Sequence, residues 1–224
     1  MTHLSDTPMS RMQRAARVVA VAAATAVGIV SFSGGVADAE EAEQAAVWLP
    51  GRVSEHADDA MDALAHFQST GDLTALRDYQ KQRAYAAIFT AEHLGYSPQE
   101  MVRAWSTTSL DHQEAVLGAL TQLGVPYRYG SRAEGQGFDC SGLTSFAWSE
   151  AGHEIARQSG SQISSADRLD RSEAKAGDLA YYPGHVMLYL GVGDAVVHAI
   201  QTGRDVELDH LSSGRSITFG DPLG

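Results

Sequence analysis

The sequence predicts an α+β fold, and a change in composition near residue 125 is the main observation behind this prediction. Residues 40–124 are rich in alanine and place apolar side chains at helical spacing, whereas residues 125–224 contain frequent glycines and short β-branched or aromatic runs between turns. Within this second part, a helix expected over residues 141–151 precedes several strand-like runs. A helix followed by several strands is typical of an α+β domain.

The first segment, residues 1–39, is expected to be a signal peptide rather than part of the fold. Arginines between Arg11 and Arg17 precede the uncharged run Val18–Phe32, which has fifteen residues. A helix that spans a membrane needs roughly 20. Small residues then flank Asp38, so we expect cleavage after Ala39 and a secreted protein. An uncleaved membrane anchor is the alternative.

Helices are expected throughout residues 40–110 and at the start of a C-terminal domain, residues 111–224. Ser97 and Ser109 stand where helix N-caps are expected, and Gly95 where a helix should end. Trp105 and Trp148 are expected in the hydrophobic core, and the four histidines of these helices are expected to be packed or exposed without a chemical role. We expect a chain break at Pro50-Gly51 and then helices over residues 53–67, 73–94, 98–105 and 110–123.

The charge balance and the cysteine count exclude several classes of protein. With 16 Lys and Arg against 28 Asp and Glu, the net charge is −12, and no basic run is present, which argues against a nucleic-acid partner. A single cysteine, Cys140, excludes an intramolecular disulfide and a multi-cysteine metal site. In a secreted protein, an unpaired thiol is either buried and inert or kept for chemistry.

The local sequence favours chemistry at Cys140. Asp139 precedes it and the expected helix over residues 141–151 follows, so the thiol lies at a helix N-terminus. Unpaired backbone N–H groups and the helix dipole stabilise an anion there, and the thiolate is the form of cysteine that attacks. The position therefore suits a nucleophile.

A proton-transfer partner for this nucleophile is expected on a β-hairpin. If the hairpin turn is centred on Val192-Gly193, residues whose numbers sum to 385 are paired. His185 then opposes Ile200, and His198 is its diagonal neighbour on the same face of the sheet, whereas a slip of one residue would separate the two side chains. We predict that Cys140, His185 and His198 act as nucleophile, base and orienting residue.

These motifs together resemble the NlpC/p60 cell-wall peptidases. The resemblance rests on Leu123–Gly130, Phe138–Leu143, Ala176–Leu179 and His185-Val186, and it extends from about residue 112 to 210. It implies a papain-like α+β catalytic domain that uses the three residues in these same roles. It also implies a thiol protease that hydrolyses peptidoglycan stem peptides, commonly at the D-γ-glutamyl–diaminopimelate bond, and that needs neither a metal nor an organic cofactor.

Four further residues are expected to contact the substrate or the oxyanion. By the same resemblance, Tyr127 matches the tyrosine beside the nucleophile, and Asp139 and Ser141 match positions that often hold a substrate amine. Arg157 lies in a segment that resembles the family's Pro-Arg-Ser sequence. Simpler interpretations stay open: Tyr127 as a plain strand residue, Asp139 as a helix N-cap and Arg157 as a solvated charge.

The expected function is therefore that of a secreted cysteine peptidase that acts on peptidoglycan stem peptides. The alternatives are an amidase or acyltransferase on the same Cys–His scaffold, and a non-enzymatic module that docks to the wall or to a partner. Residues 40–110 carry no ligand motif, so they are expected to complete the core, to cover the site as a lid, or to dock a divisome or wall-associated protein. Met187 replaces a small glycine of the family, a change expected to reshape the substrate groove.

Overall fold

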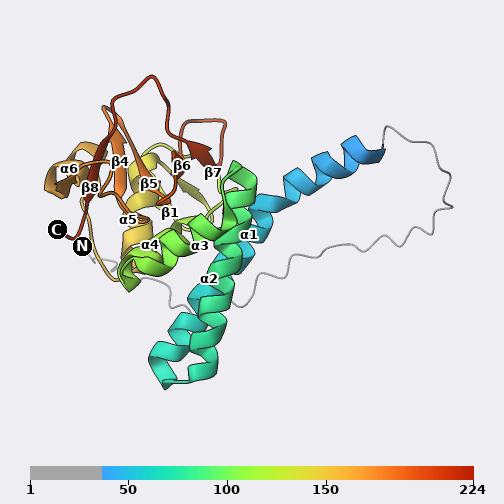
Figure 1. Ribbon diagram of the computed structural model, residues 1–224. Coiled ribbons are helices and arrows are strands. Elements are labelled where there is room, and N and C mark those ends of the chain that lie inside the picture. Colours follow the sequence, from blue (N-terminus) through green and yellow to red (C-terminus); the bar gives the residue numbers. More distant parts are fainter. Residues whose placement is uncertain (1–36) are drawn as a thin grey trace, which may run out of the picture.

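The computed structural model describes residues 37–224, with side chains from Pro50 onward, as an antiparallel sheet flanked by helices (Figure 1), which confirms the α+β prediction. The helices are α1 Ala37–Thr70, α2 Leu73–Leu94, α3 Pro98–Thr107, α4 Leu110–Leu120, α5 Cys140–Glu150 and α6 Ser159–Ser165. The strands are β1 Arg132–Ala133, β2 Gly137–Phe138, β3 Asp167–Leu169, β4 Leu179–Tyr182, β5 His185–Tyr189, β6 Ala195–Ala199, β7 Val206–His210 and β8 Thr218–Asp221.

The predicted signal peptide, residues 1–39, lies outside the described residues except for its last three, which begin α1. Among the described helices, none combines the length and the apolar composition that a membrane span requires. The pair α1 and α2 extends well beyond the sheet on one side of the molecule (Figure 1).

Local capping signals fix most of the helix ends where the sequence places them. The Ser97 side chain accepts a hydrogen bond from the Glu100 backbone N–H, and Ser109 caps α4 in the same way. Gly95 ends α2 in the left-handed conformation, with a φ of 73°. Only α4 is shorter than expected, because its last turn loosens after Leu120 and leads to Gly124.

The expected break at Pro50-Gly51 is wrong, because α1 continues through Pro50. A proline inside a helix removes one backbone hydrogen bond and crowds the preceding turn, at a cost of about 3 kcal/mol. Beyond the proline, α1 packs against α2 and α4 and buries Val53, Ala57 and Leu64 almost completely. We infer that this packing offsets the cost, so tertiary contacts override the local signal.

Six strands form one antiparallel sheet in the order β3-β8-β4-β5-β6-β7. Because side chains alternate along a strand, the sheet has two buried faces. One face carries Val186 and Leu188 in a large core to which α4 and α5 also contribute. The other carries a smaller cluster that includes Phe219 and the loop residue Leu211. Met187 is buried in this smaller cluster, so it contributes to packing.

The hairpin of β5 and β6 has the predicted register. Leu188 pairs with Val197 and Tyr189 pairs with Val196, and both pairs sum to 385. Continued along the hairpin, this register sets His185 opposite Ile200. Side chains two residues apart on one strand, such as His198 and Ile200, point to the same face of the sheet. His185 and His198 are therefore on a common face, as the sequence predicts.

The N-terminal helical region holds the turn of this hairpin. The Trp105 indole N–H donates to the Leu190 carbonyl at 2.9 Å, and Trp105 is only 1% exposed. The Asp194 backbone N–H donates to the Tyr96 hydroxyl at 2.9 Å. A Cβ at Gly193 would lie 2.4 Å from a Tyr96 ring carbon, so only glycine fits this turn. These contacts favour a core role for residues 40–110.

A chain of residues 107–224 should therefore fold poorly, because it lacks α1, α2 and α3 and leaves the hairpin turn without support. Thermal melts of this chain and of residues 40–224 test this expectation. Within the longer chain, Trp105→Ala should lower the free energy of unfolding by about 3–5 kcal/mol, whereas Tyr129→Ala, at a side chain that is 90% exposed, should have little effect. A short chain that folds and cleaves substrate faster would indicate a lid instead.

Candidate active site

Cys140 is the first residue of α5, and its neighbours fix the start of this helix. Asp139 Oδ1 accepts a hydrogen bond from the Gly142 backbone N–H at 2.6 Å, so Asp139 is the N-cap. Gly142 is required by space, because a Cβ there would lie 2.0 Å from the Ser131 carbonyl oxygen. The sequence Asp-Cys-Ser-Gly thus presents a partly exposed thiol at the N-terminus of a tightly held helix.

Asp139 and Arg157 form a two-pronged ion pair beside the thiol. Arg157 Nη1 and Nη2 donate to Asp139 Oδ1 and Oδ2, each at 2.9 Å, and Nη1 also donates to Ser141 Oγ at 3.0 Å. The Gly130 backbone N–H donates to Asp139 Oδ2 at 2.9 Å. Both carboxylate oxygens of Asp139 thus have partners within the protein, which supports the N-cap interpretation. Arg157 is bound in this pair and is not a freely solvated charge.

Tyr127 lies near Cys140. It forms a parallel bridge with Phe138, two residues before Cys140. Partial burial raises the pKa of Tyr127, and the negative charges of Cys140 and Asp139 raise it further. The phenol therefore keeps its proton at neutral pH and remains a hydrogen-bond donor.

His185 and His198 contact each other directly. His185 Nε2 and His198 Nδ1 are 3.0 Å apart, and the two imidazole planes are inclined by 71°. Both side chains are buried, with 5% and 3% of their surfaces exposed. Because Nε2 of His185 faces His198, Nδ1 is the nitrogen that remains for a nucleophile.

Two carboxylates on β7, which sequence reasoning missed, lie on the other side of His198. His198 Nε2 is 3.5 Å from Glu207 Oε1 and 3.5 Å from Asp209 Oδ2. Glu207 is the direct cross-strand partner of His198, and Asp209 follows two residues later on the same face. The alternation of two acidic residues on the strand after His198 is the one sequence signal that points to them.

The surroundings of His185 disfavour its protonated form. Burial lowers the pKa of His185 to about 4, and the positive charges of His198 and Arg215 add to this effect. Burial also lowers the pKa of His198, although Asp209 and Glu207 oppose the shift. Both imidazoles are therefore uncharged at neutral pH, as a general base requires.

The predicted site residues form two groups on elements that pack together. Cys140 and its neighbours are at the start of α5, the two histidines are on β5 and β6, and α5 packs against both strands. Within the second group, a hydrogen bond joins His185 to His198. No hydrogen bond joins the Cys140 thiol to His185 among the described residues, and catalytic hydrogen bonds commonly tighten only when substrate binds.

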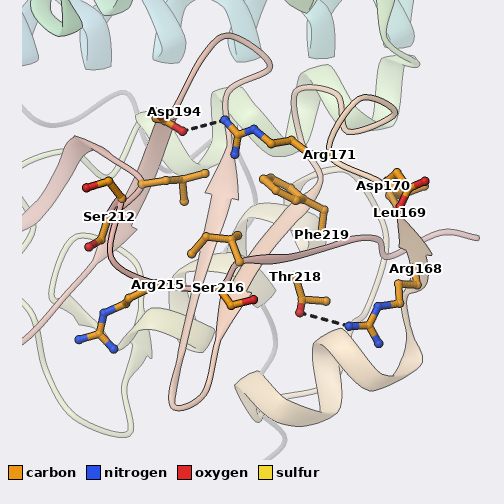
Figure 2. A pocket seen from close by; sticks show the side chains of 13 residues that line it. Arg168, Leu169, Asp170, Arg171, Asp194, Ser212, Arg215, Ser216, Thr218 and Phe219 are labelled. Atoms are coloured by element: carbon orange, nitrogen blue, oxygen red, sulfur yellow. Dashed lines mark hydrogen bonds and ion pairs between the residues drawn. The ribbon is translucent and has the colours of Figure 1, made fainter.

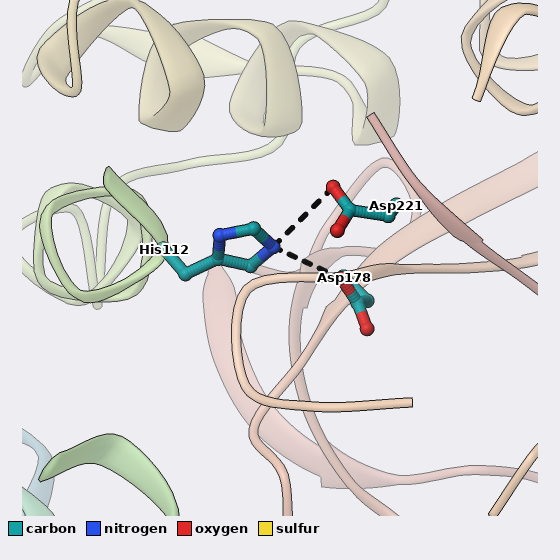
Figure 3. A group of neighbouring side chains, drawn as sticks. All are labelled: His112, Asp178 and Asp221. Atoms are coloured by element: carbon teal, nitrogen blue, oxygen red, sulfur yellow. Dashed lines mark hydrogen bonds and ion pairs between the residues drawn. The ribbon is translucent and has the colours of Figure 1, made fainter. Parts of the chain in front are cut away.

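A second cluster, of one histidine and two aspartates, was also missed by sequence reasoning and lies in the interior (Figure 3). His112 Nε2 is 3.1 Å from Asp178 Oδ1 and 3.4 Å from Asp221 Oδ1. Lys175 Nζ lies 3.0 Å from the other oxygen of Asp221. A Cβ at Gly177 would lie 2.9 Å from His112 Cβ, which explains the glycine before Asp178. The cluster is a network of polar contacts that joins α4 to the start of β4 and to β8.

A cavity of about 460 Å³ lies beside the smaller cluster of the sheet (Figure 2). Three arginines line it, but Arg171 is paired with Asp194 at 2.7 Å and Arg168 contacts the Thr218 hydroxyl. Arg215 lies over the Tyr182 ring instead, 4.2 Å from its centroid. The cavity contains none of the predicted site residues.

Comparisons with known proteins relate the C-terminal part of the chain to a protein family. The NlpC/P60 family model matches residues 124–218. A probable endopeptidase, Cgl2188 of Corynebacterium glutamicum, is 35% identical over 142 residues, which cover 61% of this chain and 63% of that protein. Peptidoglycan endopeptidase RipB of Mycobacterium tuberculosis is 39% identical over 100 residues, which cover 38% of this chain and 42% of that protein. The chain thus spans less than two thirds of these relatives.

Two solved structures are similar to part of this chain. The crystal structure of RipB has 27% identity and a TM-score of 0.45, and covers 69% of this chain and 87% of that one. RipD of the same organism, described as a non-catalytic NlpC/p60 domain protein, has 26% identity and a TM-score of 0.43, and covers 50% of this chain and 98% of that one. From the match of the family model, residues 124–218 of this chain are a domain of the NlpC/P60 family.

Proposed function

We propose that this protein is a secreted cysteine peptidase that hydrolyses peptidoglycan stem peptides at the D-γ-glutamyl–diaminopimelate bond. The observation that carries the proposal is the 3.0 Å contact between His185 and His198 on strands that pack against the helix bearing Cys140. The names of the relatives support the substrate class, because one is a peptidoglycan endopeptidase and another a probable endopeptidase.

The proposed reaction is an acyl transfer through Cys140. His185 Nδ1 takes the thiol proton, and the thiolate attacks the amide carbonyl carbon to form a C–S bond. The Cys140 backbone N–H and the Tyr127 hydroxyl stabilise the oxyanion. His185 then gives its proton to the leaving amine as the C–N bond breaks. Water that loses a proton to His185 cleaves the thioester, which releases the acid and restores the thiol.

His198 is proposed to orient His185 during these proton transfers. His185 must donate its Nε2 proton to His198 Nδ1, so the proton of neutral His198 belongs on Nε2. The carboxylates of Glu207 and Asp209 lie beside that nitrogen and favour a proton there. They are therefore positioning residues that act through His198.

The Asp139–Arg157 pair is proposed to fix the backbone at the part of the site that faces the substrate. It connects the start of α5 to the loop at Gly130 through the hydrogen bonds described above. Ser141, whose Oγ accepts a hydrogen bond from Arg157, directly follows Cys140 in sequence and is proposed to bind a substrate amine together with Asp139.

Substitution of the three proposed catalytic residues should separate their roles. Cys140→Ala and His185→Ala should reduce cleavage of purified peptidoglycan to background, whereas His198→Ala should keep a residual rate because an orienting residue is partly replaceable. Mass spectrometry of the released fragments identifies the bond. Ser149→Ala, on the same helix but bonded to the Phe146 carbonyl, is the matched control. Full activity of Cys140→Ala would exclude the proposed nucleophile.

The low pKa of His185 predicts a pH-dependent stability. Between pH 6.5 and 4 the unfolded chain binds a proton at this residue that the folded chain excludes, so the free energy of unfolding should fall as the pH is lowered. A shift from 6.5 to about 4 corresponds to a loss on the order of 3 kcal/mol. Urea titrations at several pH values should show a smaller loss for His185→Gln, and an unchanged loss for the exposed control His66→Gln. Equal slopes for His185→Gln and the parent would contradict the assignment.

The N-terminal segment is proposed to direct secretion, with cleavage after Ala39. In a bacterial host that exports the protein, the species outside the membrane should begin at Glu40, because the Val18–Phe32 run is followed by small residues at the cleavage position. N-terminal sequencing of the exported protein checks this. A chain that starts at Met1 and stays with the membrane would support an anchor.

A further inference from the structure

We propose that His198, Glu207 and Asp209 bind one divalent transition-metal ion, with Zn²⁺ as the best match, and that the bound ion blocks catalysis. The binding site is independent of the proposed function, whereas the block of catalysis rests on it. One imidazole nitrogen and two carboxylate oxygens are ligands that such ions accept. The three ligand atoms lie within 4.8 Å of one another.

Two buried polar atoms at the centre of this group lack hydrogen bonds. His198 is 3% exposed, yet its Nε2 makes no hydrogen bond, and neither does Oε1 of Glu207. The separations of 3.5 Å from Nε2 to each carboxylate oxygen exceed the usual N–H···O length of about 2.7–3.2 Å. Ligand atoms of a tetrahedral zinc ion, with bonds of about 2.0–2.2 Å, are about 3.3–3.6 Å apart. The spacing therefore matches metal ligands better than hydrogen-bond partners.

The second oxygen of each carboxylate already accepts a hydrogen bond, which leaves Glu207 Oε1 and Asp209 Oδ2 as the ligand atoms. Glu207 Oε2 accepts from the Arg204 guanidinium, and Asp209 Oδ1 accepts from the His210 backbone N–H at 2.7 Å. All three ligands come from the paired strands β6 and β7, so the backbone holds them in place. The Asp209 side chain is 40% exposed, which gives an ion a route from solvent.

The interior cluster of His112 makes an informative contrast. There His112 Nε2 lies at 3.1 Å from Asp178, and the Lys175 ammonium pairs with Asp221, so positive and polar groups of the protein already satisfy both carboxylates. At the His198 group, the described residues bring one cation into contact, Arg204, and it binds Glu207 Oε2 rather than the unpaired Oε1. Of these two groups, only the one at His198 has ligand atoms to spare.

An ion at this position would interfere with the histidine pair. A metal on Nε2 leaves the proton of neutral His198 on Nδ1, the atom that lies 3.0 Å from His185 Nε2. During catalysis His185 also carries a proton on Nε2, so two N–H groups would point at each other. The charge of the ion further opposes a positive His185. Metal binding and the catalytic proton transfer are therefore mutually exclusive.

Isothermal titration calorimetry with ZnCl₂ tests the site on the full chain carrying Cys140→Ala, so that the thiol cannot bind the ion. We expect one saturable site that weakens at least tenfold in Asp209→Asn and in Glu207→Gln. Asp62→Asn, an exposed carboxylate on α1, is the matched control and should leave the affinity unchanged. Asp209 is half exposed, so its substitution should preserve the fold, and a thermal melt without metal verifies this.

Unchanged Zn²⁺ affinity in both variants, or the absence of saturable binding, would overturn the proposal and leave the carboxylates as positioning residues only. For the effect on catalysis, Zn²⁺ should inhibit cleavage by the chain with its native thiol, and Asp209→Asn should require at least tenfold more Zn²⁺ for the same inhibition. Equal inhibition of both would assign the effect to the thiol instead. If no cleavage is found at all, the peptidase proposal fails, while the calorimetry still decides the metal site.

Discussion

The antiparallel pairing of β5 with β6 is the constraint on which the candidate site depends. Its register sets the 3.0 Å contact between His185 and His198, and a slip of one residue would turn one imidazole to the opposite face of the sheet. The turn itself is held from outside the sheet, by Tyr96 and Trp105. The helices before the NlpC/P60 domain thus contribute to the geometry of residues that are about a hundred positions away in sequence.

Features decided by a few neighbouring residues were predictable from the sequence. The caps at Ser97 and Ser109 and the helix that begins at Cys140 all depend on contacts within about four positions. The break expected at Pro50 was wrong because the burial of an entire helix face outweighs this local signal. Local patterns therefore predicted the elements better than the packing between them.

The parts of the site that the sequence did not reveal come from distant pairings. Glu207 and Asp209 are two of 28 acidic residues, and only the pairing of β6 with β7 places them beside His198. The Asp139–Arg157 pair joins residues from two segments whose approach is set by tertiary packing, so the motif alone left both interpretations of Asp139 open. Charge and residue type are compatible with such contacts, but the tertiary pairing of segments that are distant in sequence determines which contacts form.

The position of β8 in the sheet has a consequence for the order in which the strands pair during folding. This strand lies between β3 and β4, with Asp167 paired to Asp221, 54 positions later. Closing such a long loop is slow compared with the formation of the local hairpin. Until β8 joins the sheet, β3 has no partner strand and His112 lacks one of its two carboxylate partners, Asp221. The native sheet is therefore complete only after β8 has paired with both β3 and β4.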